Sequence, residues 1–298
     1  MPLSRASALR AFAAAGVASL AGCRGGGDTV RVASKNFSES LFLGELYAQI
    51  LEKHGLKVTR KLDLGSTQIA MNAMHRGEID LYPEYTGTAL LVVLKDKVMY
   101  DARAVYARVK QQFEQRFHMT WLDPSPFNDT QALASTQATA ERLHARTLSQ
   151  LGRAASQLTL AVTPEFQNRP DGLRRLQEAY GDFSFKHIVQ VDIGLRYQAL
   201  LDKRADITVA FSTDGEIEEY KLVVFDDDKR AFPPYQAAPV VRDAALSRWP
   251  AIAPALNKVA PLLDDATMRA INLAIVGPQK REAADVARDF IAQHGLGT

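Results

Sequence analysis

The residue types that could carry out enzymatic chemistry are present in this chain, but their spacing does not favour it. The six histidines show no metal-ligand spacing and no H-E-x-x-H motif; they are His54, His75, His118, His144, His187 and His294. There is no G-x-S-x-G motif, and the single cysteine, Cys23, lies close to the N-terminus. The acidic run at 226–228 is followed by Lys229 and Arg230, which is more typical of a solvated turn than of a metal site. The sequence therefore predicts no catalytic residue, metal or cofactor.

Three other segments combine aromatic, charged and turn-forming residues in a way that is unusual for an ordinary core or surface. They are S-K-N-F-S-E at 34–39, D-L-Y-P-E-Y-T-G-T at 80–88 and F-P-P-Y-Q-A-A-P at 232–239. Aromatic faces attract cations that have no N–H to donate, whereas lysine and arginine bind carboxylates. The three segments are candidates for a ligand-binding site.

The elements that must position these segments alternate between strand and helix. Strands are expected at 29–33, 57–62, 79–82, 158–162, 206–211 and 222–225. Helices are expected at 39–54, 67–76, 101–118, 171–180 and 194–203, and the chain after Val241 reads as helical, whereas 136–157 has no legible pattern. This order predicts an α/β fold whose sheet is largely parallel. The first two segments then lie just past the carboxyl ends of strands, where open α/β sheets bind ligands.

The N-terminus has the pattern of an export signal. Arg5 and Arg10 provide a positive region, and an apolar run follows at 11–20. The run is too short to cross a bilayer, for which about 20 apolar residues are needed. A positive flank before a short apolar core is typical of a secretory signal peptide.

The end of this run, L-A-G-C at 20–23, resembles a bacterial lipobox. The resemblance implies cleavage before Cys23 and a lipid on its sulfur. We therefore expect a lipoprotein signal peptide at 1–22 and a glycine-rich flexible tether at 23–28. The mature protein would lie in the periplasm or on the cell surface, anchored to a membrane by its lipid.

The composition limits the remaining classes. A chain of 298 residues has room for one large or two smaller domains. The net charge is only +2, and no clustered basic stripe is evident, which argues against a nucleic-acid-binding protein.

From residue 29 onward the chain resembles the substrate-binding proteins of osmoprotectant ABC importers, which take up glycine betaine, choline, carnitine and related compounds. The motifs that carry the resemblance occur in the family's order and spacing. They are S-K-N-F-S-E, G-E-I-D-L-Y-P-E-Y-T-G-T, R-P-D-G at 169–172, F-S-T-D-G at 211–215 and F-P-P-Y at 232–235. As a set these motifs are specific, although any one alone is weak.

The resemblance implies the type II periplasmic-binding-protein fold. Two lobes, each a mixed and mostly parallel sheet flanked by helices, are joined by two crossovers, and the ligand cleft lies between them. Lobe I would comprise 29–128 and the helical C-terminus at 231–298, and lobe II would comprise 129–230. Such a protein is not an enzyme. It is expected to be a monomer that closes around a quaternary-ammonium solute and delivers it to ABC permease and ATPase subunits.

Position by position, the resemblance also implies a binding site. Tyr85 and Tyr235 match aromatic walls that would surround a trimethylammonium group. Lys35 and Arg169 match groups that hold the ligand's carboxylate, and Thr88 matches a hydroxyl that assists them.

The chain departs from the family at two cage positions. Gln131 stands where a third tyrosine is typical, and Phe211 stands where a fourth is common. Phenylalanine keeps the aromatic face, but glutamine removes it, and a wall is worth roughly 0.5–2 kcal/mol. The loss would weaken glycine betaine binding by about a few-fold to thirtyfold. Our hypothesis is that plain glycine betaine is bound weakly or is not the preferred ligand.

Two other interpretations remain open. Gln131 could bond a polar group of a different solute, such as an amino acid, in a binding protein of the same fold. An enzyme on this fold would instead need a carboxylate or histidine aimed into the cleft in place of the aromatic walls.

Overall fold

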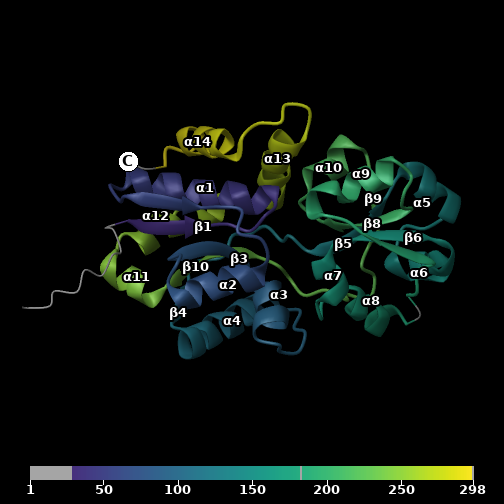
Figure 1. Ribbon diagram of the computed structural model, residues 1–298, viewed down its shortest axis with the longest axis horizontal. Helices are drawn as coiled ribbons and strands as arrows, with labels where there is room; N and C mark the ends of the chain where they lie inside the picture. The colour runs from purple at the N-terminus through teal and green to yellow at the C-terminus, as the bar shows by residue number, and fades with distance from the viewer. Residues whose placement is uncertain (1–28, 182, 297–298) are drawn as a thin grey trace, which may run out of the picture.

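The computed structural model describes residues 29–181 and 183–296, so the predicted signal peptide, the tether and Cys23 lie outside the described residues. Within these residues, two five-stranded sheets flanked by helices form two lobes side by side (Figure 1). The predicted α/β class with two mixed sheets is confirmed. In this part of the chain, no helix is both long and apolar enough to cross a membrane.

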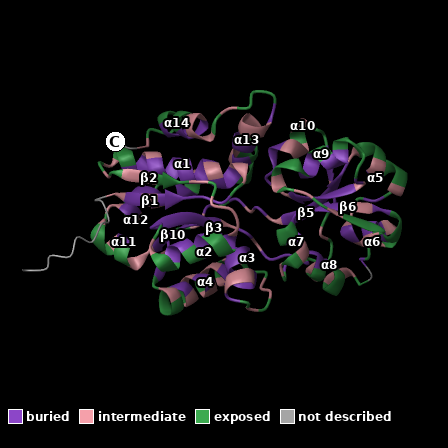
Figure 2. Cartoon of the chain, in the orientation of Figure 1, coloured by how far each residue is buried: buried purple, intermediate pink, exposed green. Residues whose placement is uncertain are grey.

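Lobe I is built around the sheet that contains the first strand. Its strands, in spatial order, are β2 (Val58–Lys61), β1 (Val30–Ala33), β3 (Leu81–Tyr85), β10 (Ala237–Arg242) and β4 (Met119–Trp121). Its helical elements are α1 (Ser38–Lys53), α2 (Thr67–Arg76), α3 (Thr86–Thr88), η1 (Ala89–Val93), α4 (Ala102–Phe117), α11 (Asp243–Arg248), α12 (Ile252–Asn257), η4 (Ala260–Leu262), α13 (Asp265–Val276) and α14 (Ala283–Gln293). Helices α1 and α14 lie on one face of the sheet and α2 and α4 on the other, with buried strands between them (Figures 1 and 2).

Lobe II is built around the second sheet. Its strands are β7 (His187–Gln190), β6 (Thr159–Val162), β8 (Ile207–Phe211), β5 (Gln131–Ser135) and β9 (Val223–Val224) in spatial order. Its helical elements are α5 (Gln137–Leu143), α6 (Leu148–Ala154), η2 (Ala155–Gln157), α7 (Pro164–Asn168), α8 (Leu173–Tyr180), η3 (Ile193–Leu195), α9 (Arg196–Leu201) and α10 (Gly215–Glu219). The stretch without a legible pattern thus forms α5, α6 and η2.

Local sequence explains the limits of the helices nearest the cleft. Helix α2 ends at Gly77, whose φ of 68° is left-handed and favours glycine. Helix α7 begins after Thr163, whose hydroxyl accepts from the Phe166 N–H, and Pro164 occupies the first helical position. The end of α2 and the start of α7 therefore follow ordinary capping chemistry.

Within the second candidate segment, residues 81–85 form strand β3 and residues 86–88 form α3, which corrects the expected strand end at 82. β3 continues to Tyr85 because β10 pairs with it antiparallel, with Pro239 opposite Pro83. β1 pairs with β3 only at Leu81. Pro83 lacks an N–H, but none is needed there, because β3 does not pair with β1 beyond Leu81. Each sheet contains two parallel and two antiparallel neighbours among the described strands, so parallel pairs are not the majority. The unpredicted strands β10 and β5 supply the antiparallel pairs.

Two crossovers connect the lobes. Residues 122–130 run from β4 to β5, and residues 225–236 run from β9 to β10. The crossovers bond to each other, since the Asp129 N–H donates to the Tyr235 carbonyl at 3.1 Å. A further contact between the lobes is the packing of α10 against α13.

Gly215 leaves no room for a side chain at this last contact. A Cβ there would lie 2.4 Å from the Leu273 nitrogen and 2.6 Å from the Asn272 carbonyl carbon, both backbone atoms. We expect Gly215→Ala to force α10 away from α13 and to lower the free energy of unfolding by about 1–3 kcal/mol, measured by denaturant titration. Gly194→Ala is the matched control, because its Cβ would meet nothing within 4 Å. Equal stability of the two variants would contradict this account.

Candidate functional site

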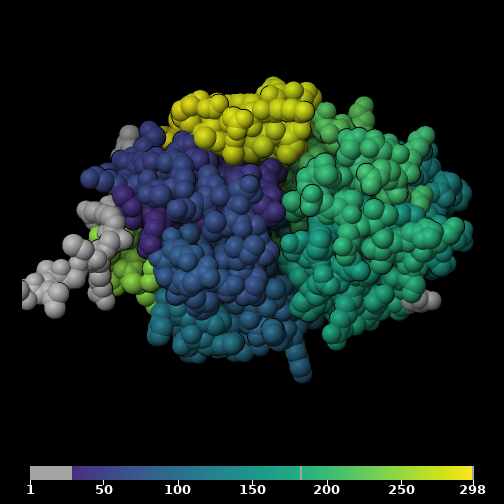
Figure 3. Space-filling view, in the orientation of Figure 1, coloured from purple at the N-terminus to yellow at the C-terminus, as the bar shows by residue number. Residues whose placement is uncertain are grey.

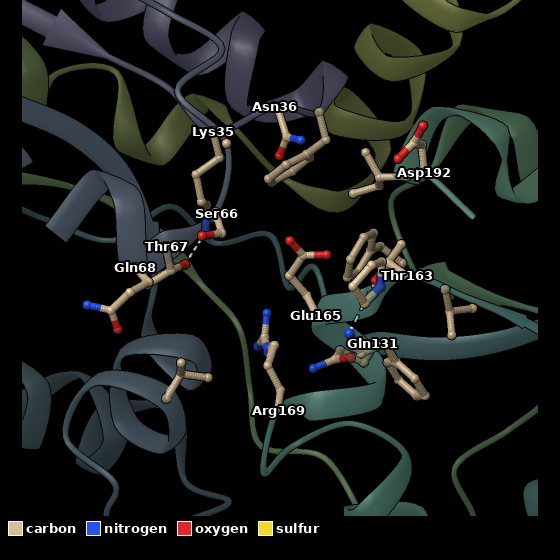
Figure 4. Close-up of a pocket in the computed structure, with 18 of the residues that line it drawn as sticks. Lys35, Asn36, Ser66, Thr67, Gln68, Gln131, Thr163, Glu165, Arg169 and Asp192 are labelled. Atoms are coloured by element: carbon tan, nitrogen blue, oxygen red, sulfur yellow. Dashed lines mark hydrogen bonds between the residues drawn. The ribbon is translucent and has the colours of Figure 1, made fainter. Parts of the chain in front are cut away.

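A pocket of about 340 Å³ lies between the two lobes, which meet along a boundary across the molecule (Figures 3 and 4). Lobe I contributes residues 35–37, residues 65–68 at the start of α2, and Val92. Lobe II contributes Gln131, residues 163–166 and 169 around α7, residues 192–193, and residues 209–211 of β8. The pocket therefore collects the ends of strands and helix starts from both sheets.

The predicted ligand residues divide into two groups. Four line the pocket: Lys35, Gln131, Arg169 and Phe211. Three lie behind the lining, each in contact with a residue that forms it: Tyr85, Thr88 and Tyr235. Whether they bind a ligand stays a prediction.

Phe37, Tyr85 and Phe211 form an aromatic cluster in which Phe37 and Phe211 line the pocket and Tyr85 lies behind, against Phe37. The Phe37 ring centroid lies 5.9 Å from that of Tyr85 and 6.1 Å from that of Phe211. The Lys35 Nζ lies 4.5 Å from the centroid of the Tyr85 ring and 5.7 Å from that of Phe37, within cation–π range. Phe37 and Phe211 come from different lobes, so this cluster spans the cleft.

Lys35 is buried and ion-paired. Its Nζ lies 2.8 Å from Glu84 Oε1, and the two side chains are 7% and 0% exposed. The ammonium also donates to the Thr67 hydroxyl, and Glu84 accepts from the Tyr82 hydroxyl and the Tyr85 N–H. Burial lowers the pKa of Lys35, and the Glu84 charge opposes that decrease.

Arg169 has its own buried partner, Asp171. The guanidinium binds the carboxylate with two hydrogen bonds, at 2.8 Å from Nε and 2.5 Å from Nη2, and Nη2 also donates to the Thr88 hydroxyl of lobe I. Asp171 Oδ2 further accepts from Gln131 Nε2 at 2.8 Å and from the Tyr235 hydroxyl at 2.6 Å. Burial raises the pKa of Asp171, but the Arg169 charge together with the hydrogen bonds from Arg169 and Tyr235 outweighs burial, and the pKa is lowered overall.

Both cations that the family resemblance assigns to a ligand's carboxylate are therefore already neutralised by the protein. Gln131 directs its amide toward Asp171 and, at 3.3 Å, toward the Tyr235 hydroxyl. In Figure 4 the Glu165 carboxylate points into the space between Lys35 and Arg169. A carboxylate entering here would have to compete with buried acids for its cation.

Behind the aromatic cluster, two carboxyl groups share one hydroxyl. Thr213 Oγ1 lies 2.6 Å from Glu39 Oε2 and 2.7 Å from Asp129 Oδ1. Glu39 also accepts from the Tyr85 hydroxyl at 2.7 Å and from Asn272 Nδ2 at 2.9 Å. The Thr213 hydroxyl has one hydrogen, so it can donate to only one of the two acids.

The arrangement assigns a proton to Asp129. Glu39 already accepts from two donors and is the better acceptor for Thr213, so the protonated Asp129 donates to Thr213, which donates to Glu39. Burial and the nearby Glu39 charge raise the pKa of Asp129 well above its ordinary value. Burial also raises the pKa of Glu39. The chain of hydrogen bonds connects lobe I, a crossover and lobe II.

The sequence motifs contain further residues of this site for which no role was predicted. Phe37 and Glu39 lie in S-K-N-F-S-E, Glu84 in Y-P-E-Y, and Asp171 in R-P-D-G. The available signal was that S-K-N-F-S-E, Y-P-E-Y and R-P-D-G each contain an acidic residue together with a cation or a tyrosine. Thr163 and Glu165 lie in none of these motifs, so the sequence did not single them out.

A ligand-sized pocket between two α/β lobes defines the chain as a solute-binding protein of the type II periplasmic class. Residues 28–293 match the family of the substrate-binding domain of ABC-type glycine betaine transport systems. The chain belongs to this family, and it is a binding protein of a transporter, not an enzyme.

Individual relatives are similar over almost their whole length. The glycine-betaine-binding protein of Pseudomonas aeruginosa is 39% identical, over 90% of this chain and 89% of the relative. The carnitine transport binding protein OpuCC of Listeria monocytogenes is 34% identical, over 90% and 87%. A crystal structure of a glycine betaine/carnitine/choline ABC transporter superposes with a TM-score of 0.73 at 30% identity, and the match covers 90% of this chain and all of that one.

The proton on Asp129 predicts a pH dependence of stability. An unfolded aspartate has a pKa of about 3.9. Between that pH and the raised pKa of Asp129, the folded protein holds a proton that the unfolded chain has released. Stability therefore falls as pH rises from there through the raised pKa, by up to about 1.4 kcal/mol per pH unit for one proton. We expect Asp129→Asn to flatten this decline, measured as unfolding free energy between pH 4.5 and 8.5.

Asp123→Asn is the control, since Asp123 is exposed on the same crossover. It should leave the slope of the wild-type profile in place. A wild-type profile with the same slope as that of Asp129→Asn would show that Asp129 is ionised in the folded protein.

Proposed function

We propose that this protein captures quaternary-ammonium osmoprotectants, such as glycine betaine, choline or carnitine, and delivers them to an ABC importer. The observation that carries the proposal is the aromatic cluster of Phe37, Tyr85 and Phe211, in which the rings of Phe37 and Tyr85 already hold the Lys35 ammonium. A trimethylammonium group has no N–H to donate, and such faces attract it electrostatically while accepting its methyl groups. The names of the relatives from Pseudomonas and Listeria support the same class of solute.

Binding would proceed by closure of the lobes. Phe211 and Arg169 belong to lobe II, whereas Phe37, Tyr85 and Thr88 belong to lobe I, so a ligand between them gains contacts only when the lobes approach. A ligand that prefers the closed state shifts the population toward it, and the permease recognises that state.

The N-terminal pattern supports a proposal for the export and the location of the protein. We propose that residues 1–22 are removed, that Cys23 is lipidated, and that residues 23–28 tether a monomer to the outer side of a membrane beside its permease and ATPase subunits. Lobe I would comprise 29–128 and 231–298, and lobe II 129–230; the positions of the two crossovers support these limits.

A second candidate is another small polar solute, such as an amino acid. The Glu165 carboxylate directed into the pocket favours it, because a primary ammonium group can donate to a carboxylate and a trimethylammonium group cannot (Figure 4). This alternative keeps the fold and the mechanism of closure and changes only the ligand.

Calorimetry with glycine betaine tests the proposed ligand class. We expect binding with a Kd in the micromolar range or weaker, and Phe211→Ala should weaken it about a few-fold to thirtyfold, because one aromatic face is worth roughly 0.5–2 kcal/mol. Tyr220→Ala, at an exposed aromatic residue that does not line the pocket, should leave the affinity unchanged.

Nanomolar binding of glycine betaine would contradict the weakness that Gln131 predicts. A thermal-shift screen that finds amino acids stabilising the protein, with no effect of betaines, choline or carnitine, would favour the alternative, since a ligand that binds only the folded state raises the melting temperature.

The lipid anchor has a separate test. We expect Cys23→Ser, expressed with its full N-terminus, to move the protein from the membrane fraction to the soluble extracytoplasmic fraction, because the acylated sulfur is lost. Mass spectrometry of the membrane-bound wild type should show a diacylated or triacylated Cys23 as the first residue. An unmodified N-terminus in the membrane fraction would refute the anchor.

A further inference from the structure

Lys35 covers the aromatic face that a quaternary ammonium would use. Lys35 lines the pocket, whereas Tyr85 does not, and the Tyr85 side chain is 2% exposed. The Lys35 Nζ lies 4.5 Å from the Tyr85 ring centroid, where a ligand's cation would be placed. The aromatic site is therefore occupied by a cation of the protein itself.

The position of this ammonium is fixed from several directions. Glu84 Oε1 accepts from it at 2.8 Å, Thr67 accepts at 3.3 Å, and Phe37 closes the other side at 5.7 Å. Glu84 is in turn held by the Tyr82 hydroxyl and the Tyr85 N–H. The ammonium leaves this position only if another anion compensates its charge, because an unpaired buried cation is costly.

Ligands differ in whether they can supply that anion. A zwitterion such as glycine betaine carries a carboxylate, to which Lys35 can turn while the trimethylammonium group takes its place on Tyr85. A plain cation such as choline offers no anion, so it meets the Lys35 charge at close range on the aromatic face. Because the ammonium occupies the Tyr85 face, choline would have to displace Lys35 from Glu84 without offering it a carboxylate.

We infer that Lys35 is a specificity-determining residue, an internal cation that excludes choline-type cations from the aromatic cluster and gives way to zwitterionic betaines. This inference rests on the proposed function. It goes beyond a simple carboxylate-binding role, because a residue that only bound the carboxylate would leave the affinity for choline unaffected by its removal.

The test is the double variant Lys35→Met/Glu84→Gln. Removing both charges leaves no buried carboxylate without its cation, and glutamine keeps an oxygen that can accept from the Tyr85 N–H. Calorimetry should show that the wild type prefers glycine betaine to choline by about tenfold or more. In the double variant, choline should bind about tenfold more tightly than in the wild type, and glycine betaine should bind more weakly.

Lys57→Met, at an exposed lysine next to β2, is the control and should keep the wild-type preference. An unchanged affinity for choline in the double variant, together with weaker glycine betaine binding, would reduce Lys35 to a carboxylate ligand and overturn the inference. Equal wild-type affinities for choline and glycine betaine would overturn it without any variant. Failure of the wild type to bind any betaine or choline would instead refute the proposed function on which the inference rests.

Discussion

A cation withdrawn from water needs a carboxylate beside it, and both cations at this pocket have one. Lys35 pairs with Glu84, and Arg169 pairs with Asp171 through two hydrogen bonds. These pairs fix the side chains before any solute arrives. They also set the free energy that a solute must offset, because its carboxylate has to replace a partner that the protein supplies. The same pairs therefore preorganise the site and account for the weak binding that we predict.

The aromatic cluster depends on the same kind of compensation. The Tyr85 hydroxyl donates to Glu39, whose other oxygen accepts from Thr213 of lobe II. The proton on Asp129 allows this chain of hydrogen bonds to be completed without two charged carboxylates in contact. The orientation of a ring in lobe I is therefore coupled to the position of lobe II, which is what a binding protein that reports closure requires.

The sequence predicted the parts of the fold that depend on local patterns. Helix α2 was predicted at its observed limits, and the strands at 158–162 and 206–211 were predicted to within a residue. The pattern of apolar residues that identifies these elements lies within each segment and does not depend on distant partners. Strands β5 and β10 were missed because they are held by partners far away in the chain, and β10 contains Pro239 opposite Pro83. The roles of Glu84 and Asp171 were not predicted for the same reason, since an acidic residue becomes an ion-pair partner only when the fold brings a cation to it.

Gln131 has a different meaning once its partners are known. A tyrosine at this position would offer a single O–H, whereas the glutamine amide offers two N–H groups, one to Asp171 and one to the Tyr235 hydroxyl. The residue therefore exchanges an aromatic wall for a firmer hold on the carboxylate that neutralises Arg169. Because Asp171 is held in place in this way, Arg169 is less free to turn to a ligand. We therefore expect the glutamine to weaken both ends of a betaine site, the aromatic end directly and the carboxylate end through Asp171.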